Sequence, residues 1–268
     1  MARESHTRAP RVILATMDRP RPDRLLAITG TLGLGLAALA LVLGLVDDRT
    51  LAGVSVWLKP GKFGLSIGLY LWTMALILPL LPGPRTRVAV RWMAALSMLV
   101  ELATIYFQAA RGVASHFNIT DPFDGLIFAA MGLGIAVNIA ANVVAAVASF
   151  RAAPQLPLPL LWGIRLGFLV LLFGTLEGSV MIARMSHTIG APDGGPGLPL
   201  VNWSTVAGDL RVAHFIGMHG FQAIPLLGWS LRAVFPARSV PLVVALALAF
   251  AGTTAYALVG ALGRHPFL

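Results

Sequence analysis

Seven runs of apolar residues, each long enough to cross a bilayer, account for most of this 268-residue chain. A helix of about 20 apolar residues spans the roughly 30 Å hydrocarbon core of a membrane and satisfies its own backbone hydrogen bonds there. We therefore expect an all-α integral membrane protein built as a seven-transmembrane helix bundle. The predicted spans are Leu25–Val46, Phe63–Leu81, Val88–Ala110, Leu126–Phe150, Leu160–Ala183, Leu210–Leu231 and Val240–Leu262.

The composition agrees with this class and excludes several others. Hydrophobic residues make up 57% of the chain and charged residues only 12%, against about 25% charged residues in soluble domains. We divide the chain into a basic tail over residues 1–24, expected to be cytoplasmic and disordered, and a transmembrane domain over residues 25–268. Cysteine is absent from the sequence, which excludes disulfides, iron–sulfur clusters and cysteine nucleophiles.

The basic residues are divided unequally between the two sides of the predicted bundle. Thirteen of the 20 Lys and Arg residues fall in the N-terminal tail and in the second, fourth and sixth connections between spans. Because short cytoplasmic loops carry an excess of positive residues, we predict a cytoplasmic N-terminus and an external C-terminus in a multi-pass protein of a bacterial inner membrane. The net charge of +9 then reflects orientation and contact with anionic lipid, and we expect no nucleic-acid partner.

Polar residues extend from the predicted outer end into several spans along single helical faces. Lys62, Tyr70 and Thr73 share one face of the second span, because residues three, four, seven or eight apart lie on the same side of a helix. Lipid cannot hydrogen-bond such faces, so they turn toward one another and form a polar crevice. We expect this crevice to open to the outside and to bind a small anionic, quinone-like or lipidic substrate. The residues assigned to substrate binding are Lys59, Lys62, Tyr70, Gln108, Arg111, Arg184, Arg211 and Gln222.

The two lysines of the chain need a separate argument, because a lysine at the start of a span often anchors it to lipid headgroups. Lys59 and Lys62 flank Pro60 and Gly61, whereas every other basic residue is Arg. This selective use favours a need for an ammonium group or a special turn, with headgroup anchoring as the alternative.

Two glutamates, Glu101 and Glu177, fall inside predicted spans. An ionisable side chain in the hydrocarbon core costs at least about 2.5 kcal/mol, and such residues are functional by default. We assign both as catalytic proton donors or acceptors. The alternative is a structural role, either as an ion pair with Arg111 or Arg184 or as a protonated, hydrogen-bonded carboxyl.

The third and fifth spans end with the same order of residues: a Glu, an Arg, a Ser-His pair, an Ile, a Pro and an Asp-Gly pair. This pattern predicts a parallel internal repeat, in which the third and fourth spans correspond to the fifth and sixth. Chance similarity is the alternative, because the alignment requires gaps. Such a repeat would place Glu101 opposite Glu177, and His116 opposite His187.

Facing imidazoles and carboxylates are typical of a metal centre without thiolates. We predict that His116 and His187, together with one of His214 and His219, bind a transition-metal ion or haem. The alternatives are that these histidines cap helices or contact headgroups, or that they act without a metal. A serine hydrolase is disfavoured, because no Gly-x-Ser-x-Gly motif is present in the sequence.

Three functions fit these residues. The first is a metal- or haem-dependent membrane enzyme, an oxidoreductase for example, acting at the outer side of the membrane. The second is a proton-coupled transporter that uses Glu101 and Glu177, although the nearly apolar cytoplasmic halves of the later spans argue against it. The third is a ligand or metal sensor without turnover. The small size of the cytoplasmic segments argues against this function.

Overall fold

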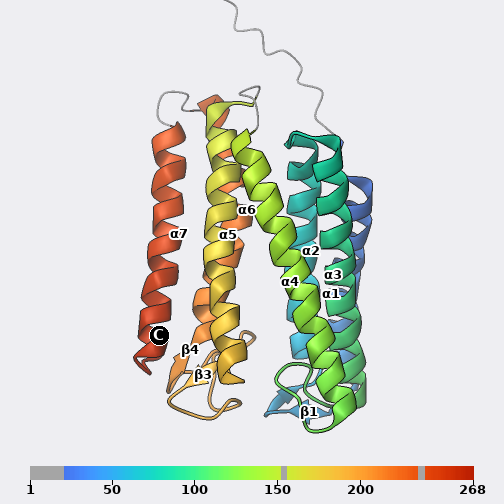
Figure 1. Ribbon diagram of the computed structural model, residues 1–268. Coiled ribbons are helices and arrows are strands. Elements are labelled where there is room, and N and C mark those ends of the chain that lie inside the picture. Colours follow the sequence, from blue (N-terminus) through green and yellow to red (C-terminus); the bar gives the residue numbers. More distant parts are fainter. Residues whose placement is uncertain (1–20, 152–155, 235–238) are drawn as a thin grey trace, which may run out of the picture.

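A computed structural model of the chain describes residues 21–151, 156–234 and 239–268. Within these ranges the chain forms seven long helices that run back and forth along one direction (Figure 1). A short 3-10 helix, η1 (Leu78–Leu80), follows the second of them. The long helices are α1 (Arg24–Val46), α2 (Leu58–Ile77), α3 (Pro84–Arg111), α4 (Pro122–Arg151), α5 (Leu158–Arg184), α6 (Leu210–Val234) and α7 (Ser239–Leu262).

Six of the long helices, all except α6, are apolar and long enough to cross a membrane. The prediction of a helical, multi-pass membrane protein is therefore confirmed. Helix α6 is 25 residues long, but His214, His219 and Gln222 lower its hydropathy.

Two very short antiparallel sheets lie at one end of the bundle, which we call the strand end (Figure 1). Strands β1 (Thr50–Leu51) and β2 (Val54–Ser55) form a hairpin between α1 and α2. Strands β3 (Thr188–Ile189) and β4 (Gly208–Asp209) pair between α5 and α6. The opposite end, where α1, α3, α5 and α7 begin, is called the arginine end.

The helices form two groups, α1 to α4 and α5 to α7. Helix α4 runs obliquely, so that it contacts α3 of its own group and α5 of the other group (Figure 1). Glycines allow close contact inside each group, as is common between membrane helices. A Cβ on Gly64 of α2 would lie 2.9 Å from the carbonyl oxygen of Gly33 in α1, and a Cβ on Gly217 of α6 would lie 2.5 Å from the Cα of Gly174 in α5. Side chains larger than hydrogen would therefore force these helix pairs apart.

Helix α2 begins five residues earlier than predicted, at Leu58 instead of Phe63. Pro60 explains the difference, because a proline in the first turn removes an N–H group that would have no partner in the helix. Lys59 and Lys62 therefore belong to the first turns of α2 and are not part of a loop. The other predicted spans agree with the observed helices to within four residues at each end.

Most of the predicted tail, residues 1–24, lies outside the described residues, which begin at Arg21. Arg24 already belongs to α1. Asp23 caps this helix, because its Oδ1 accepts the backbone N–H of Leu26 at 3.3 Å. The described chain thus enters the bundle at the arginine end and leaves it at the strand end (Figure 1).

Candidate functional site

Glu101 is the deepest charged residue near the strand end. It lies ten residues before the end of α3, which is about 15 Å along the helix axis. Its side chain is 1% exposed, and neither carboxyl oxygen has a hydrogen-bond partner among the described residues. The imidazole of His116 lies close to it, with Nε2 3.4 Å from Oε1 of Glu101. A buried carboxyl and an imidazole thus face each other inside the bundle.

His116 reaches Glu101 because the connection between α3 and α4 folds back into the bundle. Helix α3 ends at Arg111, and the next residue, Gly112, turns the chain with a left-handed φ of 75°. Asp124, at the start of α4, then anchors the connection by accepting hydrogen bonds from Gln108 and Asn118, both at 2.9 Å, and from Arg111. The carboxylate of Asp124 is 2% exposed, so these bonds hold the connection firmly.

The environment of His116 favours its neutral form. Burial lowers the pKa of His116, and the positive charge of Lys59 lowers it further, while Glu101 opposes them. The Lys59 ammonium lies 5.6 Å from the centre of the Phe63 ring, which is itself 5.5 Å from the His116 ring. Phe63 thus lies close to both the lysine and the imidazole.

The connection between α5 and α6 positions His187 differently. Nδ1 of His187 lies 3.2 Å from Oδ1 of Asp193 and 3.1 Å from Oγ1 of Thr188, both within the same connection. Burial lowers the pKa of His187 to about 4, helped by the positive charges of Arg211 and Lys59 and opposed by Asp193 and Asp209. The positive charge of Lys59 therefore lowers the pKa of both His116 and His187.

The α5–α6 connection also extends over the beginning of α2. Lys62 donates a hydrogen bond from Nζ to the carbonyl oxygen of Val201 at 2.9 Å. A Cβ on Gly194 would lie 2.8 Å from the Cβ of Ala52 in the β1–β2 hairpin. Residues from both helix groups thus cover the strand end, and Lys62 holds part of the α5–α6 connection in place.

The two histidines of α6 point to different neighbours. Nδ1 of His214 lies 2.8 Å from the carbonyl oxygen of Gly174 in α5, and a backbone carbonyl can only accept, so Nδ1 donates. His219 instead lies against Phe215 of its own helix, with ring centres 4.2 Å apart. His214 is therefore directed at α5, whereas His219 packs against its own helix.

Glu177 is as buried as Glu101, with 1% of its surface exposed, and its two oxygens also have no hydrogen-bond partner among the described residues. Arg184 is exposed at the end of α5 and makes no ion pair with it within the described ranges. Arg111 pairs with Asp124 and not with Glu101. The alternative that these arginines neutralise the two buried glutamates is therefore wrong.

The remaining predicted substrate ligands are held by protein groups. The hydroxyl of Tyr70 donates to Asn138 or Asn142 of α4, whose side-chain oxygens lie at 2.9 and 3.0 Å. Arg211 pairs with Asp209 at 2.6 Å and donates to the carbonyl of Asn202. The Gln222 amide lies within 3.2 Å of backbone carbonyls of its own helix.

Across the part of the chain that the structure describes, no three side chains of His, Asp or Glu converge on a point where they could hold a metal ion. His116, His187, His214 and His219 therefore do not form the predicted ligand set among themselves here. No protein-family model, curated protein or solved structure matches the chain.

The sequence assigned no role to the carboxylates that organise the two connections, Asp124 and Asp193. Both belong to the Asp-Gly pairs of the predicted repeat, and this recurrence was the available signal. Asp193 also lies with Glu101, His116, His187 and Lys59 in a set of mutually interacting acidic and basic groups at the strand end. Such a set can bind and release a proton, and its cations can attract an anion.

Proposed function

We propose that this membrane protein is proton-coupled and that Glu101 and His116 form its proton-binding pair. The observation that supports this proposal is a fully buried carboxyl without a hydrogen bond, 3.4 Å from an imidazole nitrogen. Buried Asp, Glu and His residues form the proton relays of pumps and transporters. Proton transfer between Oε1 of Glu101 and Nε2 of His116 would need no large movement of either side chain.

The substrate of this site would be a small anion. Quinone-like and lipidic molecules are the alternative substrates. Lys59 and Arg211 supply positive charge beside His187. An anion bound near Lys59 would favour a protonated, positively charged His116, because opposite charges in a buried site stabilise each other. Binding of the anion and uptake of the proton would thereby be coupled.

We also propose that the strand end faces the outside of a bacterial inner membrane and that α3–α4 and α5–α6 are internal repeats. Orientation is supported by the concentration of basic residues at the arginine end and its connections. The repeat is supported by the shared ending of α3 and α5, where Gly112 and Met185 are both left-handed, with φ of 75° and 52°. A reporter enzyme fused after Leu268 should be active only in the periplasm, and cytoplasmic activity would overturn the orientation.

The direct test of the proton-binding pair is an infrared difference spectrum of the detergent-purified protein between about pH 4 and about pH 9. Glu101→Gln should remove one carboxyl band from this spectrum. Asp48→Asn is the matched control, because it makes the same chemical change at an exposed position of the strand end, and should leave that band in place. An unchanged spectrum for Glu101→Gln would refute the proposal.

A metal- or haem-dependent enzyme is the second candidate, and the geometry of two histidines favours it. Nδ1 of His214 is held by the Gly174 carbonyl, and Nδ1 of His187 lies beside Asp193. Histidines that bind metals usually donate their other ring nitrogen to such an oxygen, which leaves Nε2 for the metal. Metal or a haem Soret band should then accompany the purified protein and be lost in His214→Ala. A protein purified from metal-replete cells with neither would exclude this candidate.

A further inference from the structure

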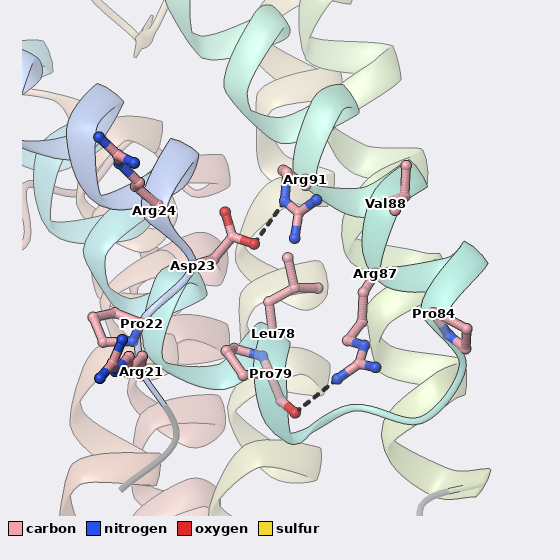
Figure 2. A pocket seen from close by; sticks show the side chains of 10 residues that line it. All are labelled: Arg21, Pro22, Asp23, Arg24, Leu78, Pro79, Pro84, Arg87, Val88 and Arg91. Carbon is pink, nitrogen blue, oxygen red and sulfur yellow. Dashed lines mark hydrogen bonds and ion pairs between the residues drawn. The ribbon is translucent and has the colours of Figure 1, made fainter.

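The arginine end contains a hollow of about 390 Å³ that the proposed proton site does not use. It lies where the beginning of α1, the short helix η1 and the beginning of α3 meet (Figure 2). Arg87 and Arg91 extend toward it from α3, while Arg21 and Arg24 lie at the entry into α1 (Figure 2). Four arginines therefore belong to the lining of one small hollow, and Figure 2 shows the guanidinium groups of Arg87 and Arg91 on its α3 side.

The positive charge of this hollow is only partly neutralised. Among the described residues, Asp23 is the one acidic side chain in its lining. Its Oδ2 accepts a hydrogen bond from Nε of Arg91 at 2.6 Å, and its Oδ1 accepts the N–H of Leu26. The carboxylate thus holds α1 against α3, and the described lining retains an excess of positive charge.

A phosphate group matches this arrangement. Guanidinium groups bind phosphate oxygens through paired N–H donors and are preferred over ammonium groups for this purpose. Arg87 donates from Nη1 to the carbonyl of Pro79 at 3.3 Å, which holds its planar group beside the hollow. The N-termini of α1 and α3 add further positive potential at the same place.

The surface beside the hollow shows where the rest of such a ligand would lie. Val88 lines the hollow, and it begins a row of exposed apolar side chains along α3 in the direction of the strand end. Val88, Trp92 and Leu96 are 47%, 50% and 53% exposed, and their spacing of four residues keeps them on one side of the helix. A phosphate in the hollow would therefore have an apolar, membrane-facing surface directly beside it.

We propose that this hollow binds the phosphate headgroup of an anionic phospholipid, with the acyl chains along Val88, Trp92 and Leu96. Basic hollows between membrane helices are known to hold anionic headgroups. A free phosphate would use the same guanidinium groups but would gain nothing from the apolar row. The proposal is independent of the proton site at the other end of the bundle.

Native mass spectrometry of the full, detergent-purified chain with added phosphatidylglycerol or phosphatidylcholine tests this site. The wild type should retain phosphatidylglycerol more strongly than phosphatidylcholine. Arg87→Gln and Arg21→Gln should each weaken phosphatidylglycerol binding by about tenfold, the loss of one charged contact. Arg85→Gln is the matched control, because Arg85 is exposed in the first turn of α3 but does not line the hollow, and it should bind like the wild type.

Each contrary outcome would overturn the proposal. Equal weakening by Arg85→Gln and Arg87→Gln would show general attraction to a basic surface. Equal retention of the two lipids would show that the phosphate charge is not recognised. Glycerol 3-phosphate that competes as strongly as phosphatidylglycerol would show that the site takes a free phosphate and that the apolar row has no part. Arg21→Gln keeps the test valid if Arg87→Gln disturbs α3, since Arg21 precedes α1 and is exposed.

Discussion

The two connections at the strand end, between α3 and α4 and between α5 and α6, contain the same kinds of residues but use them differently. In the first, His116 turns inward to the membrane-buried Glu101. In the second, His187 stays beside Asp193 of its own connection. Glu177, the counterpart of Glu101 in the predicted repeat, is consequently left without such a partner among the described residues.

This difference teaches that one residue order can support two electrostatic arrangements. The short α3–α4 connection is anchored by one buried carboxylate and directs its histidine into the bundle. The longer α5–α6 connection includes the β3–β4 pair and extends over α2. An imidazole paired with a membrane carboxyl can take part in proton transfer across the buried region, whereas one paired with a loop carboxylate mainly orders that loop.

The largest effect is expected from the carboxylates that anchor the two connections. Asp124→Ala would leave the buried donors of Gln108 and Asn118 without their acceptor, along with Arg111, at a cost of about 3 kcal/mol in the free energy of unfolding. Asp193→Ala should cost about 1 kcal/mol, because its carboxylate is 31% exposed and water can replace it. Thermal melting in detergent measures both, and equal losses would show that the connections are anchored alike.

A smaller effect is expected from the inward-facing histidine. His116→Ala would leave Glu101 buried without its neighbour, which should lower the free energy of unfolding by about 2 kcal/mol. Adding Glu101→Gln should recover most of this loss, because the double variant no longer buries a lone carboxyl. His187→Ala should change stability by less than His116→Ala, and Glu101→Gln should not compensate it. If Glu101→Gln fails to improve His116→Ala, the two side chains are not coupled.

The smallest effect concerns pH. The pKa of His187 is lowered from its ordinary 6.5 to about 4, so the fold favours the neutral imidazole. Stability from this residue is complete above about pH 6.5 and is lost as the pH falls toward about 4. The protection of the β3–β4 amides against hydrogen exchange, measured relative to the rate of an unstructured chain at the same pH, should therefore fall as the pH is lowered over this interval in the wild type.

His187→Gln should flatten this pH dependence, since glutamine does not titrate. His265→Gln is the control, because His265 is exposed beyond the end of α7, and it should retain the wild-type profile. A wild-type profile in His187→Gln would assign the acid sensitivity to another group.

Much of the architecture could be predicted because hydropathy is a local property of the chain. Six predicted spans correspond to helices that can cross a membrane, and the polar side chains of the remaining helix explain its lower hydropathy. The start of α2 was less predictable, since Lys59 and Lys62 resemble loop residues until Pro60 is placed in a first helical turn. The membrane-buried positions of Glu101 and Glu177 followed from the sequence, as did the presence of histidines in both connections.

The partners of these residues did not follow from the sequence. The residue order suggested that the two glutamates and two histidines face each other across a repeat axis, and it offered Arg111 and Arg184 as ion-pair partners. In the structure Arg111 binds Asp124, Arg184 is exposed, and Glu101 meets His116. Which groups meet depends on how each connection folds back into the bundle. This folding is decided by hydrogen bonds between residues that have no regular spacing in the sequence.

By itself, therefore, the sequence determined a membrane-spanning helical bundle with two buried carboxyls and charges concentrated at its ends, because burial in lipid is decided by the apolar length of each segment. Only the tertiary structure decided that one carboxyl contacts an imidazole while the other has no such contact in the described chain, and that arginines from α1 and α3 line one hollow. The physical reason is that short-range electrostatics depends on distances of a few ångströms, and these are set when the helices pack together.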